Sequence, residues 1–164
     1  MSGPALLFNA DASDWFENAP ARNVLVRHNR FLDTNMGPYG QGSISIIFPV
    51  EGTKGGQYFN ARNIRIEDNS FEQFQQPLLY AASVEGLSFK HNRVLFNHDF
   101  PTDLRADAPV FSLSHTRCVD VSQNELRGID HANTPNSTLL SIKEPGTPFD
   151  TASCIDSFRP LSAK

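Results

Sequence analysis

The chain carries a repeated alternation of apolar and polar residues that predicts stacked β-strands. Four segments align without gaps, and in each an asparagine is followed two positions later by an apolar residue. They are NVLVRHNRF (23–31), NIRIEDNSF (63–71), GLSFKHNRV (86–94) and CVDVSQNEL (118–126). Alternation with a period of two residues is typical of a strand, whereas apolar residues on one face of a helix recur about every 3.6 residues. We therefore predict a strand before each of the asparagines Asn29, Asn69, Asn92 and Asn124.

A second set of apolar segments precedes these strands. They are ALLFNA (5–10), SISIIF (43–48), PLLYAA (77–82) and PVFSLS (109–114), with TLLSIK (138–143) as a fifth. The Asn-Gly and Asp-Gly dipeptides typical of antiparallel hairpins are absent from the sequence, which leaves parallel stacking. We predict an all-β chain that folds as a right-handed parallel β-helix, a solenoid of about five coils.

The asparagines are expected to form a ladder at one corner of successive coils. Asparagine suits a bend because it tolerates the left-handed backbone region, and because its amide can bond both the turn and the neighbouring coil. The apolar residues after them, Phe31, Phe71, Val94 and Leu126, are expected to stack beside this ladder inside the solenoid. The remaining phenylalanines considered fit a core better than a ligand groove: Phe74, Phe89, Phe96, Phe100 and Phe111.

The first two coils carry insertions at the corner between their paired strands, DASDWFENAPAR (11–22) and PVEGTKGGQYFNAR (49–62). In the last two coils the same corner is only a short turn, at 82–86 and 114–118. Because the insertions leave adjacent coils at equivalent points, we expect them to project side by side on one flank. Loops on a rigid scaffold are where binding residues usually sit.

The two insertions place carboxylates beside aromatic side chains. The residues concerned are Asp11, Asp14, Trp15 and Glu17 in the first, and Glu51, Lys54 and Tyr58 in the second. An aromatic ring can stack on the apolar face of a pyranose, while carboxylates accept hydroxyl hydrogen bonds or act as acid and base. The flank is therefore a candidate sugar site. The same composition also fits a solvated loop whose tryptophan covers the open side of the solenoid.

Charge and composition exclude several classes. The formal net charge is −4 and the pI about 5.7, with no basic stripe, so nucleic acid is not an expected partner. No apolar run approaches the roughly 20 residues that span a bilayer, so no membrane partner is expected. The five histidines share no ligand spacing, so we expect no metal. Cys118 and Cys154 are too few for a disulfide framework, and we expect buried or half-buried thiols.

The sequence resembles glycoside hydrolase family 110, the inverting α-1,3-galactosidases, in the C-terminal portion of their parallel β-helix. The resemblance runs through residues 5–126 and rests on DASDWFENAPARNVLVRHNRF, SISIIFPVEG and NIRIEDNSFEQFQQPLLYAASVEGLSFKHNRV. We treat residues 1–164 as one β-helix segment of a longer protein, whose end at 128–164 carries little recognisable resemblance.

The resemblance implies removal of terminal α-1,3-linked galactose by direct displacement at the anomeric carbon, without a cofactor. Family members are several times longer, and their catalytic aspartates are expected upstream, near an Asp-Asp pair that this sequence lacks. Four residues are carried over as cleft-lining or sugar-contacting positions: Asp11, Trp15, Glu17 and Glu51. We therefore expect the segment to be inactive alone.

Two other functions stay open. One is a non-catalytic carbohydrate-binding or adhesive β-helix of the tailspike kind, and the other is a fragment of a polysaccharide lyase or epimerase. In each case the expected partner is a carbohydrate. We also expect self-association through open solenoid ends, because unpaired strand edges attract other strands. For the longer protein we expect a secreted or periplasmic location, although this chain carries no targeting signal.

Overall fold

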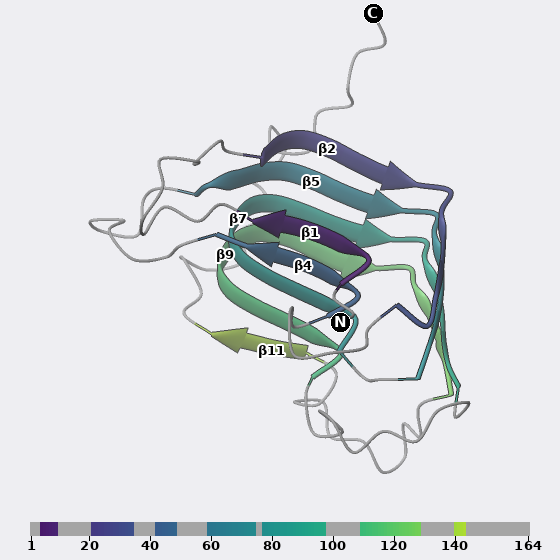
Figure 1. Cartoon of the computed structure of the whole chain (residues 1–164). Helices are drawn as coiled ribbons and strands as arrows, with labels where there is room; N and C mark the ends of the chain where they lie inside the picture. The colour runs from purple at the N-terminus through teal and green to yellow at the C-terminus, as the bar shows by residue number, and fades with distance from the viewer. Residues whose placement is uncertain are drawn as a thin grey trace, which may run out of the picture.

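The computed structural model describes residues 4–9, 21–34, 42–48, 59–74, 77–97 and 109–128, and the backbone of 140–143. Every regular element in these ranges is a strand (Figure 1). The strands are β1 (Leu6–Asn9), β2 (Ala21–Arg27), β3 (Arg30–Leu32), β4 (Ile44–Ile47), β5 (Ala61–Glu67), β6 (Ser70–Gln73), β7 (Leu79–Lys90), β8 (Arg93–Phe96), β9 (Phe111–Ser122), β10 (Glu125–Arg127) and β11 (Leu140–Lys143). None of the described residues forms a helix long and apolar enough to cross a membrane.

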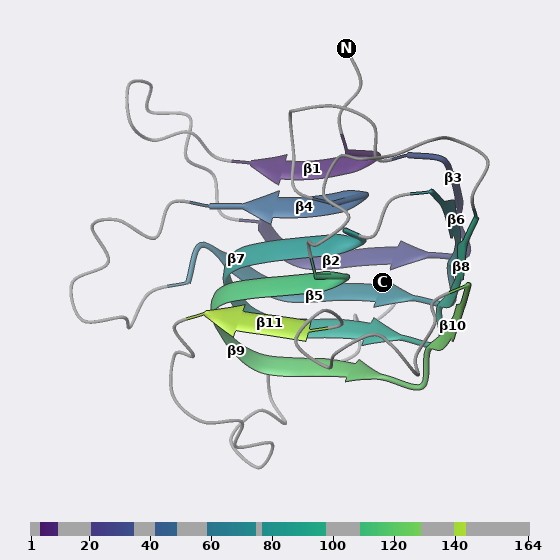
Figure 2. The same ribbon diagram turned by 90° about the horizontal axis from the view of Figure 1, so that it is seen from below.

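All pairs between these strands are parallel, and equivalent strands of successive repeats lie side by side. We call β1, β4, the first halves of β7 and β9, and β11 the first face. The second face consists of β2, β5 and the second halves of β7 and β9. The third face is β3, β6, β8 and β10, which run together along one side (Figure 2). The prediction of an all-β chain with parallel strands is confirmed.

Register places the repeated apolar residues on top of one another. Phe31 pairs with Phe71, Phe71 with Val94 and Val94 with Leu126. The rings of Phe31 and Phe71 are stacked, with centroids 4.7 Å apart and planes 11° from parallel. Phe71 is fully buried, and Leu126 packs against the same core, so the expected internal stack is confirmed.

Most of the other phenylalanines considered also lie in the core. Phe89, Phe96 and Phe111 are buried, and Phe74 is half-buried. Phe89 contacts both Phe71 and Phe111, with ring centroids 5.8 and 5.3 Å apart. Phe100 lies outside the described residues.

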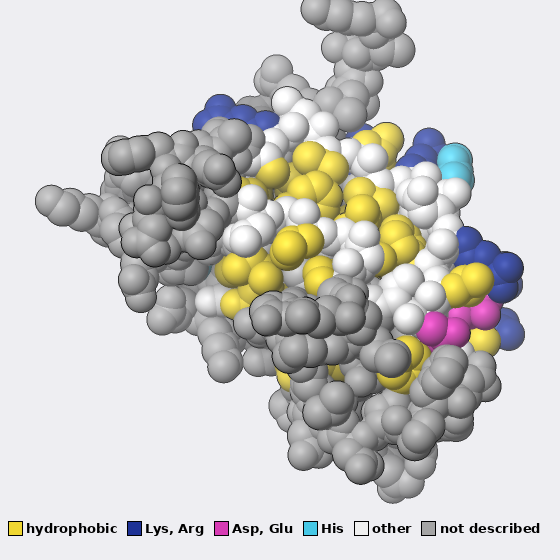
Figure 3. Space-filling model, viewed as in Figure 1, with side chains coloured by type: hydrophobic (Ala, Val, Ile, Leu, Met, Phe, Trp, Pro, Cys, Tyr) yellow, Lys and Arg dark blue, Asp and Glu magenta, His cyan; other side chains and the backbone are white. Residues whose placement is uncertain are grey.

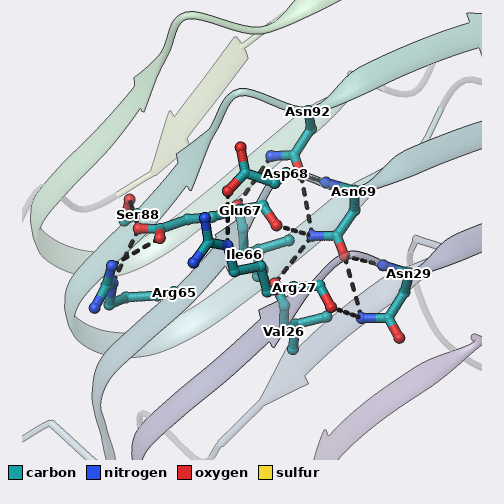
Figure 4. A network of polar contacts seen from close by, with 10 residues as sticks. All are labelled: Val26, Arg27, Asn29, Arg65, Ile66, Glu67, Asp68, Asn69, Ser88 and Asn92. Atoms are coloured by element: carbon teal, nitrogen blue, oxygen red, sulfur yellow. Dashed lines mark hydrogen bonds and ion pairs between the residues drawn. The ribbon is translucent and has the colours of Figure 1, made fainter. Parts of the chain in front are cut away.

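The four repeated asparagines, which we call the asparagine column, occupy the corner between the second and third faces (Figure 4 shows the first three). The backbone N–H of Asn29 donates to Oδ1 of Asn69 at 3.0 Å, that of Asn69 to Asn92 at 2.9 Å, and that of Asn92 to Asn124 at 2.9 Å. The side-chain amides of Asn29, Asn69 and Asn92 also donate to the next Oδ1 along the column, at 3.1–3.2 Å. The column therefore satisfies polar backbone at a bend, as a buried turn requires.

The bend itself differs from the expectation in one respect. The left-handed residue is the one before each asparagine: His28, Asp68, His91 and Gln123 have φ between 54° and 58°. The role of the asparagine is to form hydrogen bonds, because its side-chain amide contacts the neighbouring repeats. The left-handed position accepts several residue types, and it places His28 and His91 on a bend.

Cys118 corrects a second expectation. It is disulfide-bonded, so the predicted thiol at this position is wrong. It lies on the second face at a further left-handed position, with φ of 55°. The same column holds Asn23, Asn63 and Gly86, with φ of 56°, 52° and 76°. The other cysteine of the sequence, Cys154, lies outside the described residues.

Candidate functional site

The strand ends that flank the two insertions lie in register. Asn9 at the end of β1 pairs with Ile47 at the end of β4, and Ala21 at the start of β2 pairs with Ala61 at the start of β5. The two insertions thus depart from neighbouring points of the first face and return to neighbouring points of the second. We call this corner the loop corner.

In the last two repeats the loop corner is closed by the chain itself. β7 and β9 run through it as continuous strands, and each contains two left-handed residues there. These are Ser83 and Gly86 in β7, with φ of 60° and 76°, and His115 and Cys118 in β9, with φ of 47° and 55°. The expected short turn is therefore a bend within one strand. It needs no inserted residues, because left-handed residues redirect a strand.

The sequence-predicted site residues Asp11, Trp15, Glu17 and Glu51 lie outside the described residues. Their assignment as sugar-contacting positions stays a prediction. The described side chains at the same corner come from β5, β7 and β9 and from the residues just before β5.

Those described side chains form an ion cluster around Glu85. Its carboxylate accepts a hydrogen bond from Arg117 Nε at 2.9 Å and lies 3.2 Å from Arg62 Nε. The guanidinium of Arg117 also lies over the ring of Phe59, 4.7 Å from the centroid. The ring of His115 stacks on Phe59 at 4.8 Å, with an angle of 18° between the planes. Register explains the cluster, because Arg62, Glu85 and Arg117 are equivalent positions on β5, β7 and β9.

This cluster stabilises the loop corner and is not suited to binding a sugar. Phe59 is only 4% exposed, so no ring face is available to a sugar. Glu85 is held by two arginines, so its carboxylate oxygens are already engaged within the cluster. The sequence signal that could have revealed the cluster is the outward column of charges, which can be read only once the register is known.

A second polar network covers the outside of the second face. Arg65 and Glu67 form a bidentate pair at 2.9 and 2.7 Å, and the Ser88 hydroxyl donates to Glu67 at 3.2 Å (Figure 4). The hydrogen bond from Arg65 lowers the pKa of Glu67, and the same bond raises the pKa of Arg65. Burial would raise the pKa of Asp120, but hydrogen bonds from Lys90 and Ser122 outweigh it and lower that pKa.

The third face carries a shallow groove of about 190 Å³. Its polar lining comes from Ser70, Glu72, Arg93, Glu125 and Arg127. Arg93 Nε lies 3.1 Å from a Glu125 oxygen, and Arg127 contacts the other oxygen. Hydrogen bonds from Arg127 and Arg93 lower the pKa of Glu125. This pairing makes the groove a poor place for a proton donor.

The resolved carboxyl pKa shifts therefore agree in sign, since Glu67, Asp120 and Glu125 are all lowered. A general acid in glycoside hydrolysis needs the opposite, a pKa raised towards neutrality. These three carboxylates are suited to ion pairing and not to proton donation. Within the described ranges, no group of three or more His, Cys, Asp or Glu residues could hold a metal ion.

Comparison with known proteins gives a consistent set of relatives. No family model matches the chain. The α-1,3-galactosidase B of Phocaeicola vulgatus is 39% identical over 140 residues, which cover 80% of this chain and 23% of that protein. The α-1,3-galactosidase B of Bacteroides thetaiotaomicron is 34% identical over 131 residues, covering 77% and 21%. The α-1,3-galactosidase A of Bacteroides fragilis is 40% identical over 99 residues, covering 59% and 16%.

The chain thus spans less than a quarter of the length of these relatives. The aligned part amounts to 59–80% of this chain. The expected resemblance to the α-1,3-galactosidases is therefore confirmed, and this chain is related in sequence to one segment of those proteins.

Proposed function

We propose that this chain is the C-terminal β-helix segment of a glycoside hydrolase that resembles inverting α-1,3-galactosidases, and that it is inactive alone. The observation that carries the proposal is 39% identity over 140 residues to an α-1,3-galactosidase B, of which the chain covers 23%. The carbohydrate partner we propose is a glycan with terminal α-linked galactose.

The fold proposed for residues 1–164 is a single right-handed parallel β-helix of about five coils. Right-handedness follows the strong preference of parallel crossovers for that hand. The asparagine column serves as its ladder. Open edges of such a solenoid favour self-association of the isolated chain.

The active centre requires two carboxyl groups roughly 6.5–9.5 Å apart, one of which must act as an acid. The lowered pKa values of Glu67, Asp120 and Glu125 support placing this pair elsewhere. We place it in upstream coils of the longer protein. Asp11, Trp15, Glu17 and Glu51 then line the cleft from the loop corner, and the register of β1 with β4 and of β2 with β5 supports their side-by-side placement.

A secreted or periplasmic location is proposed for the longer protein. The disulfide at Cys118 supports it, because disulfides persist in oxidising compartments.

Galactose release from an α-1,3-linked digalactoside tests the proposal, with this chain and the longer protein assayed side by side. We expect release by the longer protein only, with turnover or substrate binding weakened by Glu17→Ala and unchanged by Glu72→Gln on the third face. Hydrolysis by the 164 residues alone would refute the inactive-segment proposal. Glycan binding without release by either protein would favour the non-catalytic adhesive alternative, and activity lost with a calcium chelator would favour a lyase.

A further inference from the structure

The second half of β9 has a free strand edge. On one side it pairs with β7 along its whole length, as far as Lys90 beside Ser122. On the other side, β11 pairs only with the first half of β9, and this pairing ends with Lys143 beside Ser114. Figure 2 shows β9 at the border of the sheet, with β11 beside its first half. Among the described residues, no strand lies beside 116–122 on that side.

The core is incompletely covered at this edge. The inward residues of the second half of β9, Val119 and Val121, are half-buried and pack against the core. Their register neighbours on β7, Leu87 and Phe89, are both 0% exposed. A strand that pairs with this edge must therefore bring an apolar side chain to the inner side, beside Val119.

The outward side chains of this edge are polar. On β1 and β2 the outward residues include Leu7 and Leu25, which are 52% and 41% exposed. The space-filling view shows hydrophobic side chains over β1 and between β1 and β2 (Figure 3). On the second half of β9 the outward residues are instead Asp120 and Ser122. The strand that fits this edge alternates an apolar inward residue with a polar outward one.

A segment near the end of the same chain has this alternation. Residues 118–121 read CVDV, and residues 154–157 read CIDS. The match aligns three pairs: Cys118 with Cys154, Val119 with Ile155, and Asp120 with Asp156. The likeness ends at Pro160, which stands where Asn124 stands in the preceding repeat, so the sequence does not continue the asparagine column. The segment therefore repeats the second-face strand without the corner that follows it.

The disulfide at Cys118 supplies an independent reason for this alignment. Cys118 is disulfide-bonded, and Cys154 is the one other cysteine of the sequence. Neighbouring strands lie about 4.8 Å apart, and a disulfide joins Cα atoms roughly 4.4–6.8 Å apart. Two cysteines at equivalent positions of neighbouring strands meet this requirement. In the same column of the loop corner, Asn63 Nδ2 donates to Asn23 Oδ1 at 2.9 Å, so side chains at this position already join successive repeats.

The spacing along the chain agrees with the pattern of the first two repeats. β11 ends at Lys143 on the first face, and ten residues, 144–153, separate it from Cys154. The first two repeats also carry insertions between their first-face and second-face strands, at 11–22 and 49–62. An insertion at 144–153 would leave the loop corner after β11 and return the chain to the second face at Cys154.

We propose that residues 154–158 pair in parallel with the second half of β9, joined to it by a Cys118–Cys154 disulfide, with Ile155 over Val119. The disulfide then fixes the last second-face strand at the loop corner and keeps this edge of β9 from pairing with another chain. The inference goes beyond the proposed function, because it requires neither a sugar nor any residue outside this chain.

The pairing of the cysteines is tested by digestion of the unreduced chain with trypsin, followed by mass spectrometry. Cleavage after Arg117, Arg127 and Lys143 gives fragments 118–127 and 144–164, and we expect them to be joined by one disulfide. A phosphine should separate them as two thiols, with its phosphorus oxidised to the phosphine oxide by oxygen from water. Free thiols before reduction, or a disulfide between two copies of fragment 118–127, would overturn the proposal.

The register is tested by hydrogen exchange of the β9 amides from Val119 to Ser122. We expect exchange at least about tenfold faster in Cys154→Ser and in Ile155→Ala, because exchange reports local opening of the strand. Asp156→Asn is the matched control, since its side chain points outward in the proposed register, and its exchange should stay within about twofold of the unchanged chain. The β5 amides report whether each variant is folded.

Equal exchange in Ile155→Ala and Asp156→Asn would overturn the proposed register, and unchanged exchange in Cys154→Ser would overturn the role of the disulfide. Loss of protection in β5 as well as β9 in both Cys154→Ser and Ile155→Ala would also contradict the proposal, because the effect is expected at one edge only. Galactose release plays no part in these readouts, so failure here is distinguishable from failure of the hydrolase proposal.

Discussion

Replacement of Asn69 by alanine removes the most connected side chain of the asparagine column. Oδ1 accepts from the N–H and Nδ2 of Asn29 at 3.0 and 3.2 Å. Nδ2 lies 3.0 Å from the Val26 carbonyl, 2.9 Å from that of Glu67 and 3.1 Å from Oδ1 of Asn92. Two hydrogens shared among three acceptors give two net bonds, so about four bonds are lost in all.

Each bond contributes about 0.5–1.5 kcal/mol net, and buried partners left unpaired cost more than exposed ones. Since Asn69 is 3% exposed, water cannot replace the lost partners. We expect Asn69→Ala to lower the free energy of unfolding by about 3 kcal/mol. Asn29→Ala is the matched control, because its side chain is exposed and, among the described residues, donates to two acceptors, Arg27 O and Asn69 Oδ1. Its expected cost is about 1 kcal/mol.

Equilibrium urea unfolding followed by circular dichroism measures both values. The ratio matters more than either number, because the two substitutions share their chemistry and differ in burial. Equal costs for Asn69→Ala and Asn29→Ala, or a cost below about 1 kcal/mol for Asn69→Ala, would refute the view that the column stabilises the stack.

Three further outcomes follow from the same structure. Phe71→Ala should cost about 3–5 kcal/mol in urea unfolding because Phe71 is fully buried and stacked on Phe31, and a cost near that of a surface change would contradict the stacked core. Gly86→Asn should cost less than about 1 kcal/mol, because Asn23 and Asn63 adopt the same left-handed conformation in its column. Gly128→Asn should be much worse, since a Cβ there would clash with the carbonyl oxygen of Phe96, and equal stability of the two variants would refute this reasoning. Because the folded-state pKa of Glu67 is lowered by Arg65, its contribution to stability is present above the unfolded-state pKa and lost as pH falls through the folded-state value. The urea midpoint should therefore drop in acid less steeply for Glu67→Gln than for the unchanged chain, and identical pH profiles would count against the pair.

Periodicity was sufficient to predict the strands and their stacking. The period-two segments became β2, β5 and the second halves of β7 and β9, and the spacing of Phe31 and Phe71 after their asparagines placed them in register. These features follow from one-dimensional pattern, because a parallel stack places equivalent residues on top of one another.

Contacts between repeats could not be predicted in the same way. The ion cluster of Arg62, Glu85 and Arg117 joins residues that are unequally spaced in the sequence, because the segments between successive coils differ in length. Their proximity follows only once the strand register is known. The left-handed residue at the bend was also missed. Because asparagine tolerates the left-handed conformation, the sequence pointed to the asparagine itself. In the structure, the left-handed residue is His28 or its equivalent, one position earlier.

The most direct test of whether this chain can act as the segment it resembles is to place it in a related enzyme in place of that segment. The 140 aligned residues of the Phocaeicola vulgatus α-1,3-galactosidase B are replaced by the corresponding residues of this chain, and galactose release from an α-1,3-linked digalactoside is measured. We predict that the chimera releases galactose and that Glu17→Ala in the inserted segment weakens release. A chimera that has the circular dichroism of the unaltered enzyme but releases no galactose would contradict the account.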